Sequence, residues 1–134
     1  MDEFSFVAYG EPVGQGSMRH IGGGRIIASN DKALKLWRAT IAAAVNEKRR
    51  EVGKWTFTGA VGLEVRFFVS RKKSHAKLDL PVKPYDLDKQ LRAVNDGISI
   101  DCDLVENDSQ VVRIDASKAF GDEPRAEIRV YSVT

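Results

Sequence analysis

A period-two alternation of apolar residues runs through the middle of the chain, and it restricts the fold more than any other pattern. In the segment GAVGLEVRFFVS, every second residue is apolar: Val61, Leu63, Val65, Phe67 and Val69. Successive side chains of a β-strand point to opposite faces, so this spacing predicts a strand with one apolar face. The fold therefore contains a sheet.

Two other segments have helical spacing. The first begins at N-cap candidates in residues 29–31 and ends before Gly53, a suitable C-cap, and its apolar residues are Leu34, Trp37, Ile41, Ala44 and Val45. The second starts near Asp88 and ends by Ser99, with an apolar stripe of Leu87, Leu91, Val94 and Ile98. The sequence predicts two helices.

Strand-forming segments also occur near both ends of the chain. Residues 4–9 predict a first strand, and residues 18–21 and 25–29 predict a hairpin around the glycines at 22–24. Two further strands are expected at residues 110–119 and 126–133. Because strands and helices mix without regular alternation and without repeats, we expect an α+β fold, a small mixed sheet packed against two helices.

Composition limits the classes of protein to which this chain can belong. A chain of 134 residues with 43% hydrophobic content buries one core, so we expect a single domain over residues 1–134. The formal charge of +2 only mildly favours an anionic partner. One cysteine, Cys102, excludes an internal disulfide, and no Cys and His cluster is present for structural zinc. Without an apolar run near ~20 residues or a basic signal start, a soluble, cytoplasmic protein with no membrane contact is expected.

Two aspartates stand where the second helix begins, in the segment KPYDLDKQLRAVND. Asp86 lies just before the helix and Asp88 at its start, while Asp88, Arg92 and Asp96 follow one another at i, i+4 and i+8 and share a side. The positive end of the helix dipole favours negative charge there. Mg²⁺ commonly takes one or two carboxylates together with waters and phosphate oxygens. The two aspartates are therefore candidate metal ligands.

A third candidate ligand is Asp108, in the segment ENDSQVV before a predicted strand. We expect it to lie beside the second helix and to complete the site. Each of these acids also has an ordinary structural interpretation. Asp88 with Arg92 fits a helix cap and an exposed ion pair, and Asp108 fits a turn. These alternatives stay open on the residues alone.

The ordered set of motifs resembles the RusA family of Holliday junction resolvases, crossover junction endodeoxyribonucleases that are often phage or prophage encoded. The resemblance rests on Asp86-Leu87-Asp88, then Arg92 and Asp96, then Asp108-Ser109-Gln110-Val111, and more weakly on the loop GEPVGQGSMRH. It implies a small α+β homodimer that uses Mg²⁺, with Mn²⁺ as a substitute, to nick DNA symmetrically at four-way junctions during DNA recombination and repair.

The resemblance also assigns roles residue by residue. Asp86, Asp88 and Asp108 match the metal-binding acids of the family, so a metal held there would activate a water and neutralise charge on the phosphate. The sequence departs from the family at three positions. Arg92 stands where the family generally has an essential lysine, Lys89 where asparagine is frequent, and Asn107 in place of an acid. Arg92 is permanently charged, so we expect electrostatic stabilisation from it, with Lys89 as a second such group.

Positive charge gathers in the loop that leads to the two aspartates. Its cationic or titratable residues are Arg71, Lys72, Lys73, His75, Lys77 and Lys83, opposed only by Asp79. Such a loop would follow DNA phosphates, although a solvated charged surface explains it equally well. Arg19, His20 and Arg25 of the predicted hairpin are further candidate DNA contacts. Trp37 and Trp55 are expected to pack in the core or in an interface.

These observations predict a Mg²⁺-dependent, structure-selective endodeoxyribonuclease that resolves Holliday junctions and other branched DNA by paired nicking. Two rival interpretations remain, a nucleic-acid-binding module without catalysis and an unrelated Mg²⁺-dependent nuclease, which Glu64-Val65-Arg66 faintly suggests. A two-fold substrate calls for a dimer. The apolar helix face around Trp37 and the hairpin near Ile26 are the candidate dimer contacts.

Overall fold

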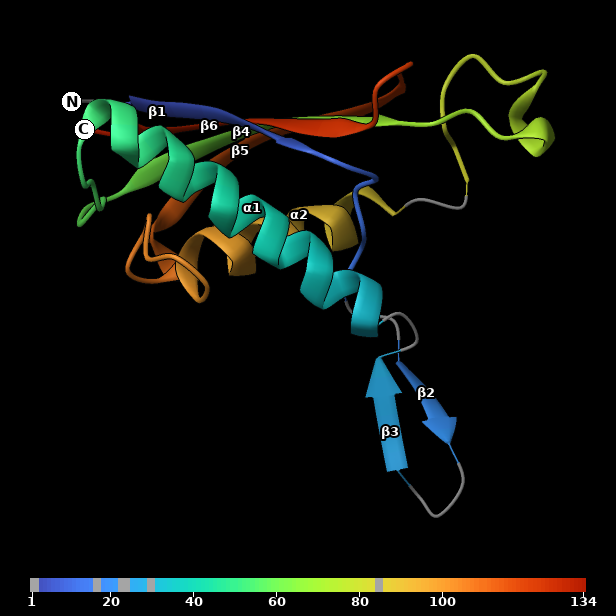
Figure 1. Cartoon of the computed structure of the whole chain (residues 1–134), viewed down its shortest axis with the longest axis horizontal. Coiled ribbons are helices and arrows are strands. Elements are labelled where there is room, and N and C mark those ends of the chain that lie inside the picture. The colour runs from blue at the N-terminus through green and yellow to red at the C-terminus, as the bar shows by residue number, and fades with distance from the viewer. Residues whose placement is uncertain (1–2, 16–17, 22–24, 29–30, 84–85) are drawn as a thin grey trace.

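A four-stranded sheet with two helices on one face forms the body of the protein (Figure 1). The structure, a computed structural model, describes residues 3–15, 18–21, 25–28, 31–83 and 86–134. The strand order is β1-β6-β4-β5, and the strands are β1 (Glu3–Tyr9), β4 (Val61–Val69), β5 (Val111–Phe120) and β6 (Arg125–Ser132). Only β4 and β5 are parallel, so the sheet is mixed. The predicted α+β architecture is confirmed.

The remaining elements also agree closely with the sequence. The helices are α1 (Asp31–Val52) and α2 (Leu87–Ser99), and β2 (Met18–Ile21) pairs with β3 (Arg25–Ala28) as the predicted hairpin. Two short 3₁₀ helices, η1 (Lys73–His75) and η2 (Asp108–Gln110), were not predicted. The expected N-cap at residues 29–30 and the hairpin glycines at 22–24 lie outside the described residues. No helix in the described part of the chain is long and apolar enough to cross a membrane.

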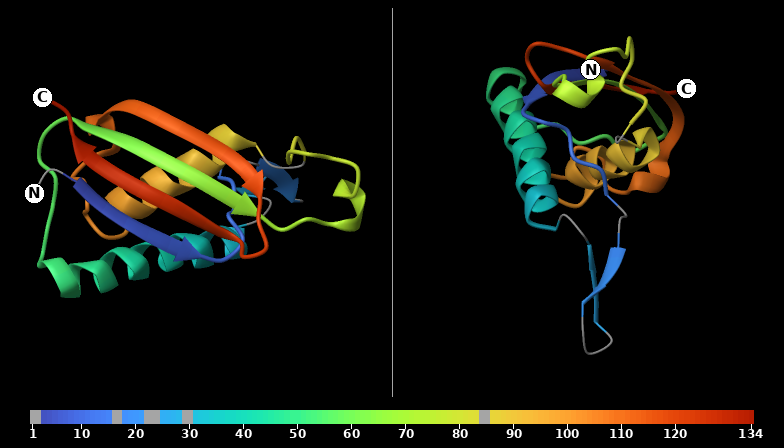
Figure 2. Two further views of the ribbon diagram at one scale, coloured as in Figure 1. Left: turned by 90° about the horizontal axis from the view of Figure 1, so that it is seen from above. Right: turned by 90° about the vertical axis from the view of Figure 1, so that its right-hand side faces the viewer.

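The core lies between the sheet and the helices, as the two rotated views show (Figure 2). The alternating apolar residues of β4 are all buried on the side that faces α1 and α2. Helix α1 contributes Leu34, Trp37, Ile41 and Val45 to this core. Gly97 of α2 lets the helices approach closely, because a Cβ built there would lie 3.0 Å from a side-chain carbon of Ile41. This contact fixes α2 against α1.

Trp37 is part of this core. Only 3% of its surface is exposed, so the helix face around it is unavailable to a second chain, and the proposed dimer contact at Trp37 is wrong. Trp55 is half-buried and packs edge-to-face on Phe57, with ring centroids 5.5 Å apart. Both tryptophans are packing residues of their own chain. The other suggested contact, near Ile26, involves a side chain outside the described ones.

The second face of the sheet carries paired charges. Arg129 contacts Glu3 at 2.7 Å and Glu64 at 3.7 Å, and Arg66 contacts Asp115 at 3.1 Å. Exposed ion pairs of this kind contribute little stability each. They do engage Glu64 and Arg66 with neighbouring strands, which leaves the suggested restriction-type site at residues 64–66 without support.

Candidate metal and DNA site

The acid pair, Asp86 and Asp88, opens helix α2. Asp86 is the N-cap residue, with an extended backbone, and its carbonyl oxygen accepts the first helical hydrogen bond from Gln90 N at 3.0 Å. Its carboxylate makes no capping hydrogen bond, and Asp88 follows in the first turn. Both residues are exposed. Side-chain capping of the helix therefore does not account for either carboxylate.

Two cationic residues flank the acid pair. The ammonium of Lys89 lies 3.3 Å from the carboxylate of Asp86. Arg92 is exposed one turn beyond Asp88, and it makes no ion pair or hydrogen bond with the residues that the structure describes. The alternative of an Asp88–Arg92 ion pair is therefore not realised. This end of α2 presents acids that suit a metal ion beside cations that suit phosphate oxygens.

A loop from the N-terminal region docks along α2 beside the acid pair. The backbone N–H of Gln15 donates to the carbonyl of Lys89 at 2.9 Å, and the Gln15 amide nitrogen donates to the carboxylate of Asp96 at 2.5 Å. Gly14 packs on the Cβ of Lys89. Asp96 is thereby committed to holding this loop. In the sequence, only the turn-like segment GQG marked the region of Gln15. The contact between Gln15 and Asp96 joins residues 81 positions apart, so no local pattern predicted it.

Asp108 lies at the opposite end of α2. It starts η2 and shares a shallow hollow with the last residues of the helix, lined by Ser99, Ile100, Asp103, Glu106, Asn107 and Asp108. Thirteen helical residues separate the ends of α2, which corresponds to about 20 Å. Among the residues that the structure describes, no three His, Cys, Asp or Glu side chains lie close enough together to hold a metal ion. One chain therefore brings Asp86 and Asp88 together but does not bring Asp108 to them.

The segment that carries Asp108 is fixed by its neighbours. The Asn107 side chain accepts a hydrogen bond from Ser109 N at 2.8 Å and so caps η2. Gln110 reaches across to the segment before β4, where its amide donates to the carbonyls of Phe57 and Gly59, both at 2.9 Å. The Asp108 side chain is left exposed by this arrangement. Sequence reasoning missed the anchoring role of Gln110.

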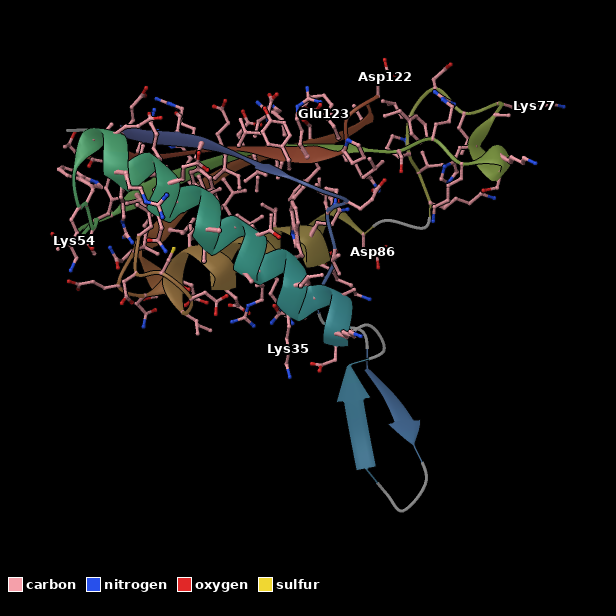
Figure 3. All side chains as sticks on the ribbon, in the orientation of Figure 1. Lys35, Lys54, Lys77, Asp86, Asp122 and Glu123 are labelled. Atoms are coloured by element: carbon pink, nitrogen blue, oxygen red, sulfur yellow. The ribbon has the colours of Figure 1, made fainter. Side chains whose placement is uncertain are left out.

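The basic loop, residues 71–83, is a folded arm that extends beyond the sheet (Figure 3). Arg71 donates to the carbonyls of His75 and Leu78, both at 2.7 Å, and its guanidinium lies 4.1 Å from the ring centroid of Phe120. His75 is buried and accepts a hydrogen bond from Lys72 N at 3.1 Å. Arg71, which is exposed, and His75, which is buried, thus hold the loop together through contacts within the chain.

The lysines of the basic loop point into solvent. Lys72, Lys73, Lys77 and Lys83 are all exposed. Figure 3 shows Lys77 at the tip of the arm and Asp86 between this arm and the β2–β3 hairpin. Arg19, His20 and Arg25 belong to that hairpin, but their side chains lie outside the described ones, so their contact with DNA stays a prediction.

Cys102 has no place in this site. Its half-buried thiol donates to the carbonyl of Gly97 at 3.3 Å. Burial raises the pKa of the Cys102 thiol above its usual range, so the reactive thiolate is disfavoured. The residue is a packing element at the C-terminal end of α2.

Comparison with known proteins gives one full-length relative and one family. The relative, the uncharacterized protein YqaN of Bacillus subtilis (strain 168), is 29% identical over 146 aligned positions that cover all of this chain and 99% of YqaN. The family match extends over residues 10–131 and so includes the docking loop, the basic loop, the acid pair and Asp108. Its description is endodeoxyribonuclease RusA. With the acid pair exposed at a helix N-terminus beside Lys89 and Arg92, this match shows that the chain belongs to the RusA family of endodeoxyribonucleases.

Proposed function

We propose that the protein is a Mg²⁺-dependent, structure-selective endodeoxyribonuclease that resolves Holliday junctions and other branched DNA by paired nicking. The observation that carries the proposal is the acid pair, two exposed carboxylates at the start of α2 whose oxygens are not used for capping. Family membership supports nuclease chemistry at this site. Mn²⁺ is an acceptable substitute for Mg²⁺, since carboxylate and water ligands suit both ions.

The donor set fits a hard cation. Asp86 and Asp88 supply two carboxylates at the positive end of a helix, leaving the other coordination positions to waters and phosphate oxygens. When bound, the ion lowers the pKa of a coordinated water and offsets charge on the non-bridging oxygens. Arg92 projects from the next turn and stabilises the negative charge of the phosphate without transferring a proton. Lys89, now against Asp86, is a second cation within reach of the phosphate.

In this proposal, a second copy of the chain supplies the third carboxylate of the metal site. Asp108 is exposed and matches a metal-binding acid of the family, yet it lies a helix length from the acid pair. Carboxylates at opposite ends of α2 meet when two copies lie antiparallel about a two-fold axis. Each site then combines Asp86 and Asp88 of one copy with Asp108 of the other. A dimer of this kind has two equivalent sites, which suits paired incisions in a four-way junction.

The decisive assay is nicking of a synthetic four-way junction beside linear duplex of matched sequence. The proposal expects Mg²⁺-dependent nicks at symmetry-related positions in the junction and little cleavage of the duplex, with EDTA abolishing both. A module without catalysis would bind the junction and leave it intact. A nuclease with no preference for branched structure would cut both substrates equally.

Replacing Lys72 and Lys73 by alanine should weaken junction binding without moving the cleavage positions. Exposed lysines on the basic loop suit phosphate contacts, which carry affinity and little sequence information. The slope of log affinity against log salt should fall by roughly two, about one for each phosphate that a lysine no longer neutralises. The measurement is a titration of junction in EDTA at several salt concentrations.

The matched control changes Arg50 and Lys54 to alanine. Both are exposed, and they lie near the C-terminal end of α1, where Figure 3 places Lys54 far from the basic loop. This control removes the same net charge and should bind as the parent does. Equal losses of affinity in the two double variants would mean that the lysines of the basic loop contribute only to the overall charge and make no specific contact with DNA phosphates.

A further inference from the structure

Lys89 places a positive charge directly against the acid pair. Its ammonium nitrogen lies 3.3 Å from a carboxylate oxygen of Asp86, one turn earlier in the chain. The exposed fraction is 39% for the lysine side chain and 57% for the aspartate side chain, so the lysine is the better covered of the two. Asp86 is one of the two carboxylates that the proposed function assigns to the metal ion. In the structure this carboxylate therefore already has a counter-ion.

The docking loop that contains Gly14 and Gln15 restricts the Lys89 side chain at its base. The backbone N–H of Gln15 donates to the Lys89 carbonyl at 2.9 Å. Gly14 comes so close that a Cβ built there would lie 3.1 Å from the Cβ of Lys89. A side chain packed in this way has fewer rotamers to lose than an ordinary surface lysine. The packing therefore favours the contact with Asp86 over the many positions open to a free lysine.

A hard cation on Asp86 and the Lys89 ammonium in its present position repel one another. Mg²⁺ binds a carboxylate oxygen at about 2.1 Å. An ion on the oxygen that Lys89 contacts would thus lie no farther than the sum of the two distances, about 5.4 Å, from the ammonium nitrogen. This separation is below the Debye length of ~8 Å at physiological salt, so the repulsion is only partly screened. Tight metal binding requires that Lys89 moves away from Asp86.

We propose that Lys89 competes with the metal ion for Asp86 and that DNA relieves this competition. The inference rests on the proposed function, because it concerns the ion and the phosphate of that site. Without DNA, the ammonium stays on Asp86 and weakens metal binding. When DNA arrives, its phosphate oxygens offer Lys89 another anionic partner, and Asp86 is released to the ion. The acid pair then takes up metal chiefly when DNA is present.

Metal binding and DNA binding are coupled through this one side chain. If DNA raises the affinity for the ion by some factor, the ion raises the affinity for DNA by the same factor. Part of the factor is direct attraction between the ion and the phosphate, which does not depend on Lys89. The rest is the release of Asp86 by Lys89, and removal of the lysine charge should abolish that part alone.

Mn²⁺ binding in the absence of DNA tests the competition, because EPR quantifies the free ion and no cleavage is involved. Lys89→Met keeps the length of the side chain and removes its charge, and it should bind Mn²⁺ about fivefold more tightly than the parent. Lys89→Arg keeps the charge and should bind Mn²⁺ as weakly as the parent. Lys54→Met removes an exposed charge just after α1, far from Asp86 (Figure 3), and should leave the affinity unchanged.

Three results of this experiment would overturn the inference. Equal affinity in the parent and in Lys89→Met would make the contact with Asp86 an ordinary surface ion pair, which Lys89 leaves at no measurable cost. Equal gains in Lys89→Met and Lys54→Met would assign the effect to overall charge. Tight binding by Lys89→Arg would assign it to the shape of the lysine side chain.

Junction affinity measures the coupling from the DNA side. Anisotropy titrations in EDTA and in Ca²⁺, another hard cation that prefers oxygen ligands, give the factor by which metal strengthens junction binding. A denaturing gel verifies that the junction stays intact. The factor for the parent should exceed that for Lys89→Met by about fivefold, the same gain that the variant shows in metal binding alone. Equal factors in the two proteins would contradict the coupling.

The outcomes for coupling and for activity are distinguishable. A parent that nicks junctions in Mg²⁺, with Mn²⁺ affinity unchanged in Lys89→Met, retains the proposed function and loses this inference. A parent that leaves junctions intact, with tighter Mn²⁺ binding in Lys89→Met, retains the competition at Asp86 and loses the proposed function. Absence of Mn²⁺ binding from both proteins overturns the inference, and nicking of the junction in Mg²⁺ then decides the proposed function by itself.

Discussion

Asp88→Asn should reduce junction nicking in Mg²⁺ by roughly a hundredfold or more, the size of effect seen when one charge-stabilising group is removed from an active site. The change keeps the shape of the side chain and removes its charge. Asp88 is exposed and makes no hydrogen bond or ion pair with the described part of the chain, so the fold should be unaffected. The measurement is single-turnover nicking with saturating enzyme.

A junction-binding assay distinguishes a loss of catalysis in Asp88→Asn from damage to the protein. Without metal, the acid pair repels DNA phosphates, so Asp88→Asn should bind the junction in EDTA as tightly as the parent or more tightly. Asp122→Asn is the control, because Asp122 is an exposed aspartate in the turn after β5, away from the acid pair (Figure 3). Near-parental nicking by Asp88→Asn would remove this residue from the site.

The sequence predicted the elements of the fold well, because their signals are local. The alternation in β4 and the helical spacing in α1 and α2 report which face of each element is buried, and the structure agrees within a residue or two. The parallel pairing of β4 with β5 has no local signal. It joins segments about 50 positions apart, so strand order emerged only from the assembled sheet.

The roles of charged residues were harder to predict than the elements. Arg71 and His75 were grouped with the lysines of the basic loop because composition cannot tell which side chains make contacts within their own chain. Both side chains contact the ring of Phe120, which is far away in the sequence. The position of Asp108 relative to the acid pair was difficult to predict for a similar reason. Closeness to α2 in the sequence does not specify which end of the helix a residue approaches.

Asp108→Asn should lower nicking as severely as Asp88→Asn does, although the two residues lie at opposite ends of α2 within one chain. As a ligand from the partner copy, Asp108 holds the same ion. As a mere turn residue it would tolerate asparagine, which suits most turns that aspartate does. The same pair of assays, single-turnover nicking in Mg²⁺ and binding in EDTA, measures both effects.

Mixing the two inactive variants tests most directly whether each site is shared between copies. In a dimer of one Asp88→Asn chain and one Asp108→Asn chain, one shared site loses both acids and the other keeps all three. An equal mixture that exchanges subunits freely should therefore recover about a quarter of the parental sites, each making a single nick. Mixing Asp88→Asn with Asp86→Asn should recover none, because every site then lacks one acid. Recovery only in the first mixture is the predicted result. If both mixtures stay inactive while subunit exchange is verified, each site lies within one chain, and the shared site is contradicted.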